Sequence, residues 1–165
     1  MSTPSKRFRV ALSFPGEKRD YVEAVAVLLA QKLGGEEAIL YDRFHTAEFA
    51  RRNLGFYLPK LYHEHADLIV VVLCADYEEK EWCRLEWSAI FDVLKKRQDD
   101  DVMFFRSDDA EIPGVFSTDG SAPVDAFTPE AAFRLILQRL ARNEGKPRDF
   151  YLVDSEAGDA PGTLR

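Results

Sequence analysis

Cysteine is scarce in this sequence, and long apolar runs are missing. The chain of 165 residues contains two cysteines, Cys74 and Cys83. Because Cys74 lies inside an apolar stretch and a disulfide-held secreted domain would need more cysteines, we interpret both as reduced thiols of a cytoplasmic protein. The longest apolar run, Leu68 to Ala75, is far shorter than the roughly 20 residues that cross a membrane. No apolar signal-peptide core follows the basic residues near the N-terminus, so we expect no membrane association.

A surplus of basic residues is also missing. The chain has 29 acidic and 22 basic residues, which gives a formal net charge of −7. Proteins that coat duplex DNA carry a basic surplus, so we expect no direct nucleic-acid binding. A local pocket can still hold a small anionic ligand.

Phosphate-loop and metal-site patterns are absent as well. The sequence contains neither G-x-x-x-x-G-K-[ST] nor G-x-G-x-x-G. Ser13 and Phe14 stand where a phosphate-receiver domain would have acidic residues for a metal. His63 and His65, two apart on a predicted helix, point in different directions, which favours a solvated helix end over a zinc site. We therefore expect no metal.

What the sequence does contain is an alternation of strand and helix patterns. Strands are predicted at 8–14, 38–41, 68–73, 102–105 and, as a short fifth strand, 124–127. Helices are predicted at 17–33, 54–65 and 79–97, and from the Thr128-Pro129 start to Gly145. The segment 68–73 is apolar on both faces, which is typical of a central parallel strand covered by helices.

This alternation predicts an α/β fold of the flavodoxin-like type. We expect a three-layer sandwich with a five-stranded parallel sheet of order 2-1-3-4-5 and helices on both faces. Such sheets bind ligands at the carboxyl ends of the strands, where strand order reverses between the first and third strands. The crevice would be lined by residues 13–17, 42–45 and 74–86.

Glu86 is the most informative residue of that crevice. It falls inside the apolar stripe of the predicted helix 79–97, beside Trp82 and Leu85. A carboxylate on a buried helix face is costly unless it is paired or faces a polar cavity. Glu86 therefore either pairs with Arg84 or Arg106 and orients the helix, or serves as a functional group at the crevice.

Four segments together resemble a known family. Arg9 to Phe14, Tyr41-Asp42, Leu68 to Leu73, and Glu81 to Trp87 with its Trp-Cys-x-x-Glu pattern are similar to a Toll/interleukin-1 receptor (TIR) domain of the bacterial type. The expected organisation is an N-terminal arm at 1–7, the TIR domain at 8–143, and a tail or the start of a linker at 144–165.

The resemblance implies an enzyme. Many bacterial TIR domains cleave NAD between nicotinamide and ribose, and their catalytic glutamate matches Glu86. NAD+ is then the substrate, no cofactor is expected, and the protein would be an effector or signal source in antiphage defence. The expected substrate-binding residues at the crevice are Ser13, Phe14, Asp42, Phe44, Trp82 and Cys83. Three of them, Phe14, Phe44 and Trp82, are candidates to stack on nicotinamide or adenine, with core packing as the alternative for each.

A single carboxylate suffices for this chemistry. Ordinary glycosidases use two carboxyl groups, one of which protonates the leaving oxygen. Nicotinamide in NAD is already cationic, so one anion beside the ribose can orient its hydroxyls and stabilise an oxocarbenium-like transition state. Water or an adenine nitrogen then captures the intermediate, giving a glycohydrolase or a cyclase.

The alternative is a non-enzymatic TIR module that works by association. The segment Arg43 to Arg52 lacks the Pro-Gly pair of animal signalling members, and the last helix lacks their Phe-Trp box, which argues against receptor adaptor function. We expect this polar segment to be a mobile loop at the crevice rim. Its residues Arg43, His45, Phe49, Arg51 and Arg52 would mediate self-association, and a sensor domain or partner protein would act with it.

Overall fold

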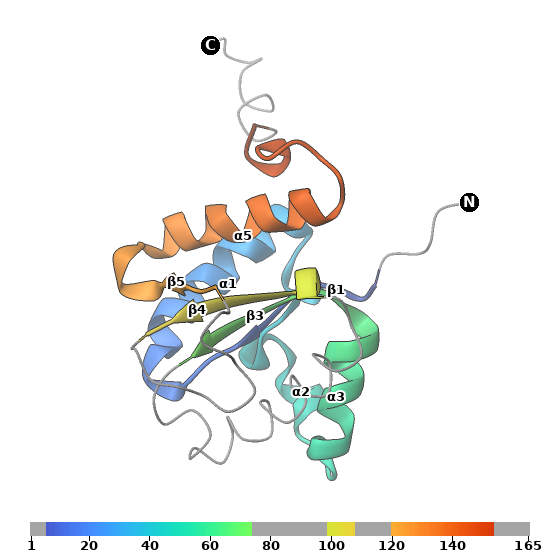
Figure 1. The fold of residues 1–165 in the computed structure, drawn as a ribbon. Helices are drawn as coiled ribbons and strands as arrows, with labels where there is room; N and C mark the ends of the chain where they lie inside the picture. The colour runs from blue at the N-terminus through green and yellow to red at the C-terminus, as the bar shows by residue number, and fades with distance from the viewer. Residues whose placement is uncertain (1–5, 74–98, 108–119, 154–165) are drawn as a thin grey trace, which may run out of the picture.

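A five-stranded sheet forms the centre of the molecule (Figure 1). The structure is a computed structural model and describes residues 6–73, 99–107 and 120–153. The strand order is β2-β1-β3-β4-β5, and every neighbouring pair is parallel. The strands are β1 (Phe8–Ser13), β2 (Ile39–Leu40), β3 (Ala66–Leu73), β4 (Val102–Arg106) and β5 (Ala122–Pro123). The predicted fold class and strand order are confirmed.

The strand β3 lies in the middle of the sheet and contributes to both faces. Leu68, Val70 and Val72 belong to one core cluster, whereas Ile69 and Val71 belong to the other. All five side chains are at most 5% exposed. Because neither face of β3 is polar, a layer of helices has to cover each side.

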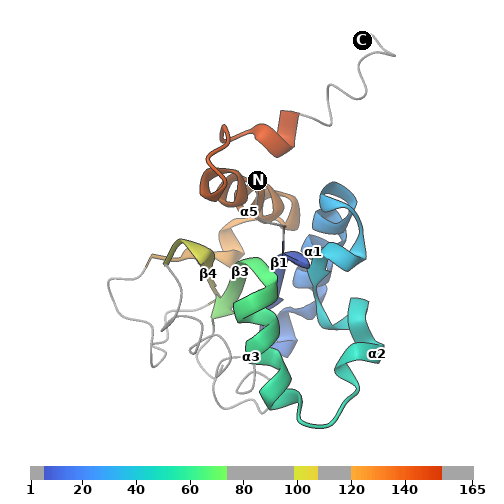
Figure 2. The same ribbon diagram turned by 90° about the vertical axis from the view of Figure 1, so that its right-hand side faces the viewer.

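Helices supply those two layers. The described helices are α1 (Arg19–Leu33), the short α2 (Thr46–Phe49), α3 (Leu54–His65) and α5 (Pro129–Asn143). α1 and α5 lie side by side on one face of the sheet, and α3 packs on the other (Figures 1 and 2). None of the described helices is long and apolar enough to cross a membrane.

Two helix ends follow the signals in the sequence. Gly34 ends α1 in a left-handed conformation with φ of 107°, and its N–H donates to the Ala30 carbonyl. At the start of α5, the Thr128 hydroxyl accepts a hydrogen bond from the Ala131 N–H at 3.1 Å, and Pro129 occupies the first turn. Both ends were predicted from the residue types alone.

The prediction of the fifth strand was wrong by two residues. We expected it at 124–127, but β5 is Ala122–Pro123 and residues Val124–Ala126 form a 3-10 turn. A two-residue strand has no alternation for a pattern to detect. Val124 is buried although it lies outside β5, because its side chain packs in the core cluster that contains residues of α1 and α5.

Residues 144–153, which follow α5 and were expected to be part of a tail or linker, pack against the rest of the domain. Tyr151 and Leu152 pack against the core cluster of α1 and α5. The Tyr151 hydroxyl accepts a hydrogen bond from Arg9 of β1 at 2.7 Å, and Arg9 and Tyr151 both donate to Glu144. Residues 144–153 therefore fold back onto the amino end of the sheet. The predicted helix 79–97 lies outside the described residues.

Replacing Thr128 with alanine should lower the free energy of unfolding by about 1 kcal/mol, because the Ala131 N–H loses its acceptor. Thr128→Ser keeps the hydroxyl and should stay close to the wild type. Urea denaturation of the three proteins measures the difference. An equal loss in both variants would mean that the Thr128 methyl group, and not the cap, stabilises α5.

Candidate functional site

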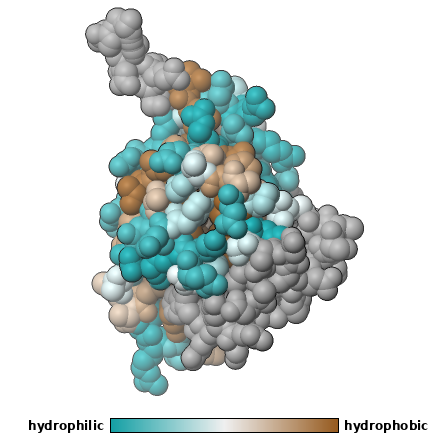
Figure 3. Space-filling view, turned by 90° about the vertical axis from the view of Figure 1, so that its left-hand side faces the viewer, coloured by the Kyte–Doolittle hydropathy of each residue, from teal (hydrophilic) through white to brown (hydrophobic). Residues whose placement is uncertain are grey.

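The carboxyl ends of β1, β2 and β3 lie at one edge of the sheet (Figure 1), on the side of the molecule that Figure 3 turns toward the viewer. Strand order reverses there, because the chain places β2 on one side of β1 and β3 on the other. Ligand sites of open parallel sheets lie at such a reversal. The end of β3 is fixed by Ser107, whose N–H and hydroxyl donate to the Leu73 carbonyl at 2.8 and 2.9 Å.

Part of the predicted site lies outside the described residues. This holds for the expected catalytic residue Glu86, for Trp82 and Cys83, and for the alternative partner Arg84. Arg106, the other alternative partner, donates from Nε to the Ser121 hydroxyl at 3.2 Å. The described half of the site is the rim formed after β1 and β2.

Asp42, the residue predicted at the end of β2, is held by an arginine from α1. Nη1 and Nη2 of Arg19 each donate to one oxygen of Asp42 at 2.9 Å. This bidentate geometry is among the strongest that a carboxylate can form, and it raises the pKa of Arg19 above its already high ordinary value. The Asp42 side chain is 21% exposed, and each of its oxygens has a further lone pair for a ligand hydroxyl.

Tyr41 joins this ion pair to a second one. Its hydroxyl accepts from Arg19 at 3.1 Å and donates to Glu23 at 2.7 Å, while Arg43 donates to the same Glu23 oxygen at 2.7 Å. Burial, together with the hydrogen bond to Glu23, raises the pKa of Tyr41 to about 12. The hydrogen bonds from Tyr41 and Arg43 lower the pKa of Glu23. The rim is therefore one connected network from Asp42 to Arg43.

Of the residues in this network, the sequence analysis predicted only Asp42 and Arg43 as site residues. Arg19, Tyr41 and Glu23 were not among the predicted site residues, and their association depends on tertiary contacts between α1 and the end of β2. One signal was present: Arg19 follows the end of β1 closely and so begins α1 at the carboxyl edge of the sheet.

The two described aromatic candidates differ in their surroundings. Phe14 is 4% exposed and belongs to the core cluster of α1 and α5. Its ring lies 5.1 Å from the Arg19 guanidinium and 5.8 Å from the Tyr41 ring. Phe44 is only partly buried and meets Tyr41 edge-on at 5.1 Å. The Phe14 ring thus packs in the core beneath the rim, whereas part of the Phe44 ring is exposed to solvent.

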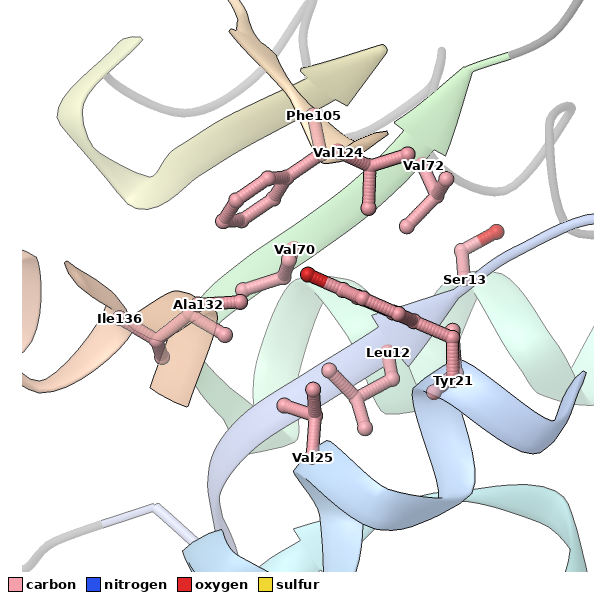
Figure 4. Close-up of a pocket in the computed structure, with 11 residues that line it drawn as sticks. Leu12, Ser13, Tyr21, Val25, Val70, Val72, Phe105, Val124, Ala132 and Ile136 are labelled. Carbon is pink, nitrogen blue, oxygen red and sulfur yellow. The ribbon is translucent and has the colours of Figure 1, made fainter. Parts of the chain in front are cut away.

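Ser13, fully buried, lies at the mouth of a small apolar cavity below the rim (Figure 4). Tyr21 reaches across this cavity, and its hydroxyl donates to the Phe127 carbonyl at 2.9 Å. The cavity has about 20 Å³ of free space, which is enough for about one water molecule. A nucleotide is too large to enter this cavity.

The segment after β2, which we expected to be a loop, consists largely of short helical elements. Residues 42–45 form a 3-10 turn, and residues 46–49 form α2. His45, expected at the rim, is 7% exposed; its Nε2 lies 2.8 Å from the Ile39 carbonyl and its ring meets Phe8 edge-on. Phe49 is partly buried against the cluster of α3. His45 is therefore closed to a partner, whereas the Phe49 side chain remains partly exposed.

Glu48 holds this segment to the rest of the fold. Arg7 donates to its two oxygens at 2.8 and 2.5 Å, and the Tyr57 hydroxyl of α3 donates to it as well. The Arg7 hydrogen bonds, with help from Tyr57, lower the pKa of Glu48 to about 2. Arg51 lies over the Tyr57 ring at 3.7 Å and also donates to the Glu48 carbonyl, whereas Arg52 is exposed.

The chemistry available at the described rim is that of a hydroxyl-binding edge. It offers two carboxylates, Asp42 and Glu23, two guanidinium groups, Arg19 and Arg43, and the partly open ring of Phe44. Within residues 6–73, 99–107 and 120–153, no group of three or more metal-binding side chains comes together.

The chain is similar to a known protein family and to a curated protein. A family model described as TIR domain matches residues 10–137. The chain is also 33% identical over 144 residues to the 3' cyclic ADP-D-ribose synthase AaTIR of Aquimarina amphilecti, which covers 87% of this chain and 43% of that protein. The chain therefore spans less than half the length of the curated relative it matches.

The stability contributed by Glu48 should depend on pH. Its pKa is below the ordinary value in the folded protein, so the stabilisation is complete above about pH 5 and is lost as the pH falls toward 2. A pKa shift of this size corresponds to at most about 3 kcal/mol in the free energy of unfolding. The contribution of Glu48 is smaller, because solvent screens its partner Arg7, which is 40% exposed. Glu48→Gln should therefore destabilise the protein by about 1–2 kcal/mol at pH 7 and by roughly half as much or less near pH 3.

Denaturant titrations at the two pH values measure this difference. Glu37→Gln is a suitable control, because Glu37 is exposed and lies in a different element, the turn Glu36–Ala38, and it should leave the free energy of unfolding unchanged at both pH values. A Glu48→Gln effect of equal size at pH 3 and pH 7 would contradict the ion-pair assignment.

Proposed function

Because the chain belongs to the TIR domain family, we propose that it cleaves NAD at the bond between nicotinamide and ribose. The observation that carries this proposal is the similarity, over 87% of the chain, to a relative named as a cyclic ADP-ribose synthase. The parallel sheet with its reversal of strand order supports it, since this edge is where such folds bind nucleotides. A cyclic ADP-ribose is the expected main product, and ADP-ribose from hydrolysis is the competing one.

The proposed reaction breaks the bond from the ribose C1′ to the nicotinamide nitrogen. The electron pair of that bond leaves with nicotinamide, which becomes neutral, so no acid has to protonate it. Positive charge develops on the ribose, and Glu86 is proposed as the anion that stabilises it. An acceptor atom within the same molecule then forms the new bond in cyclisation, and water forms it in hydrolysis.

The described rim is proposed to hold the substrate. Asp42 keeps free lone pairs while Arg19 fixes its orientation, so its oxygens can accept hydrogen bonds from sugar hydroxyls. Phe44 is partly open and is proposed to stack on one of the two bases, together with Trp82. Phe14 is proposed only to support Arg19 and Tyr41 from below, since it is buried.

One experiment tests the activity itself. Concentrated protein is incubated with NAD, and the products are separated by chromatography beside standards of nicotinamide, ADP-ribose and cyclic ADP-ribose isomers. Release of nicotinamide supports the proposal, and the second product distinguishes cyclisation from hydrolysis. No nicotinamide release by folded protein at any concentration would favour the non-enzymatic interaction module instead.

Glu86→Gln should lower NAD cleavage on the order of a hundredfold or more, because the transition state loses its charge stabilisation while the side chain keeps its shape. Glu86→Ala should be equally inactive and should melt at a similar temperature. Nicotinamide release and thermal unfolding are measured on the same preparations. Near-normal turnover by the glutamine variant would refute the catalytic role, and unfolding of the alanine variant would favour the structural interpretation of Glu86.

We also propose that self-association activates the enzyme, as part of a bacterial antiphage response. The segment after β2 is anchored by Glu48 and Phe49, so a neighbouring copy would act by adding residues to the site. Of the residues first expected to mediate association, Arg43 and Arg51 have partners in the same chain, whereas Arg52 makes no ion pair with the described residues.

Specific activity should rise with protein concentration and with crowding. Arg52→Asp should reduce activity only under conditions in which the protein assembles, because Arg52 lies away from the Asp42 rim in the chain and is exposed. NAD turnover per molecule, measured over a wide range of dilution, tests this. A constant turnover down to nanomolar protein would exclude control by assembly, and an equal loss in dilute Arg52→Asp protein would indicate direct substrate binding.

A further inference from the structure

At the end of β2, Asp42 presents oxygen atoms that accept hydrogen bonds and cannot donate them. Arg19 donates one N–H to each of these oxygens at 2.9 Å, and the Asp42 side chain is 21% exposed. Both oxygens keep a lone pair for a ligand. A ligand hydroxyl can donate to them. A phosphate monoester carries a charge of about −1.5 to −2 at pH 7 and only accepts, so Asp42 repels it.

The cations near Asp42 are already paired. Asp42 itself holds the Arg19 guanidinium, and the Arg43 guanidinium donates to Glu23 at 2.7 Å. The Tyr41 hydroxyl donates its proton to the same Glu23 oxygen at 2.7 Å. These two carboxylates and two guanidinium groups balance each other, so together they carry no surplus positive charge that would attract an additional phosphate.

The place of Asp42 in the fold favours the adenosine side of a dinucleotide. Asp42 follows β2, whereas Glu86, proposed above for the cleavage step, comes after β3 in the chain. β1 separates these two strands, so their carboxyl ends are about 10 Å apart at the usual strand spacing. A diphosphate likewise separates the two riboses of a dinucleotide, and one carboxylate after each strand would suit one ribose each.

Dinucleotide-binding sheets of another kind use an acidic residue in the same way. There, an aspartate or glutamate after the first strand and helix accepts a hydrogen bond from the 2′-hydroxyl of the adenosine ribose, and a nearby arginine is what accommodates a 2′-phosphate instead. In this chain the acidic residue is present, and the nearest arginine, Arg19, is engaged in holding it.

We propose that Asp42, oriented by Arg19, selects dinucleotides whose adenosine ribose has a free 2′-hydroxyl and rejects those that carry a 2′-phosphate. The chain then cleaves NAD in preference to NADP. The inference rests on the proposed NAD cleavage and adds the residue that decides between the two dinucleotides. Asp42 determines specificity, and Arg19 acts through it as a positioning residue.

Substitutions of Asp42 and Arg19 should have opposite effects on this selectivity. Asp42→Asn keeps the shape of the side chain but removes its charge, so the Arg19 guanidinium becomes available to a 2′-phosphate. Arg19→Gln instead leaves the Asp42 charge without its partner, which increases the repulsion of a phosphate. Damage to the fold would weaken both dinucleotides alike and would leave their ratio unchanged.

The selectivity is measured as kcat/KM for NAD divided by kcat/KM for NADP, from nicotinamide release. We expect a ratio of at least about ten for the wild type, because like charges in contact are strongly disfavoured. Asp42→Asn should lower this ratio at least about tenfold. Arg19→Gln should raise it, while KM for NAD also rises because Asp42 is no longer held in position.

Asp67→Asn is the matched control. Asp67 is also an aspartate held by an arginine, with Nε of Arg9 donating at 3.2 Å, and its exposure of 27% is close to that of Asp42. Because it lies at the amino end of β3, its substitution should leave the ratio unchanged. If thermal melting shows that Asp42→Asn is unstable, the double variant Arg19→Gln with Asp42→Asn removes both charges together and should bring the two values of kcat/KM close to each other.

A binding assay separates this inference from the proposed activity. Calorimetric titration of concentrated protein with ADP-ribose and with ADP-ribose 2′-phosphate measures the same discrimination without cleavage, and the wild type should bind ADP-ribose at least about tenfold more tightly. Such discrimination without nicotinamide release would refute the proposed cleavage alone.

Other results would overturn the role of Asp42 alone. These are equal turnover of NAD and NADP by the wild type, equal binding of the two ADP-ribose ligands, a ratio that Asp42→Asn leaves unchanged, and a ratio that falls in Arg19→Gln. A protein that neither binds ADP-ribose nor cleaves NAD would overturn both proposals.

Discussion

Burial of β3 on both faces is the constraint on which the rest of the fold depends. A strand with no polar face is stable only between two layers of helices, and α1 with α5 on one side and α3 on the other provide them. Parallel neighbours then follow, since each crossover through a helix returns the chain in the same direction. Polar side chains can gather only at the two ends of the strands.

Each end of the sheet accordingly carries its own polar network. At the carboxyl end, Arg19 holds Asp42 and Tyr41. At the amino end, Arg9 of β1 bonds Asp67 of β3 and Tyr151 of the C-terminal segment. The chemistry proposed for the chain belongs to the first network, whereas the second fastens the segment after α5. This separation lets the carboxyl end vary its side chains without loosening the sheet.

The sequence was most informative where local residue types decide the structure. The apolar run of β3, Gly34 after α1 and the Thr128 cap were all recognisable, because each depends on a few adjacent residues. The two-residue β5, the four-residue α2 and the docked segment 144–153 were missed, since each is held by distant partners. The same limit applies to the site: Asp42 was predicted from its place after β2, but its partner Arg19 is 23 residues away and no spacing rule connects them.

The ion pair between Arg9 and Asp67 bears on how the chain reaches its fold. These residues are 58 positions apart, and they stand where β1 begins to pair with β3, with Val10 opposite Leu68. The central pairing of the sheet must therefore close a long loop that contains α1, β2, α2 and α3, at an entropic cost that rises with loop length. Contacts of such high sequence separation slow folding. Because β3 is apolar on both faces, a shifted alignment would bury much the same surface, and the Arg9–Asp67 charge pair is one of the few contacts that distinguish the correct alignment from its neighbours.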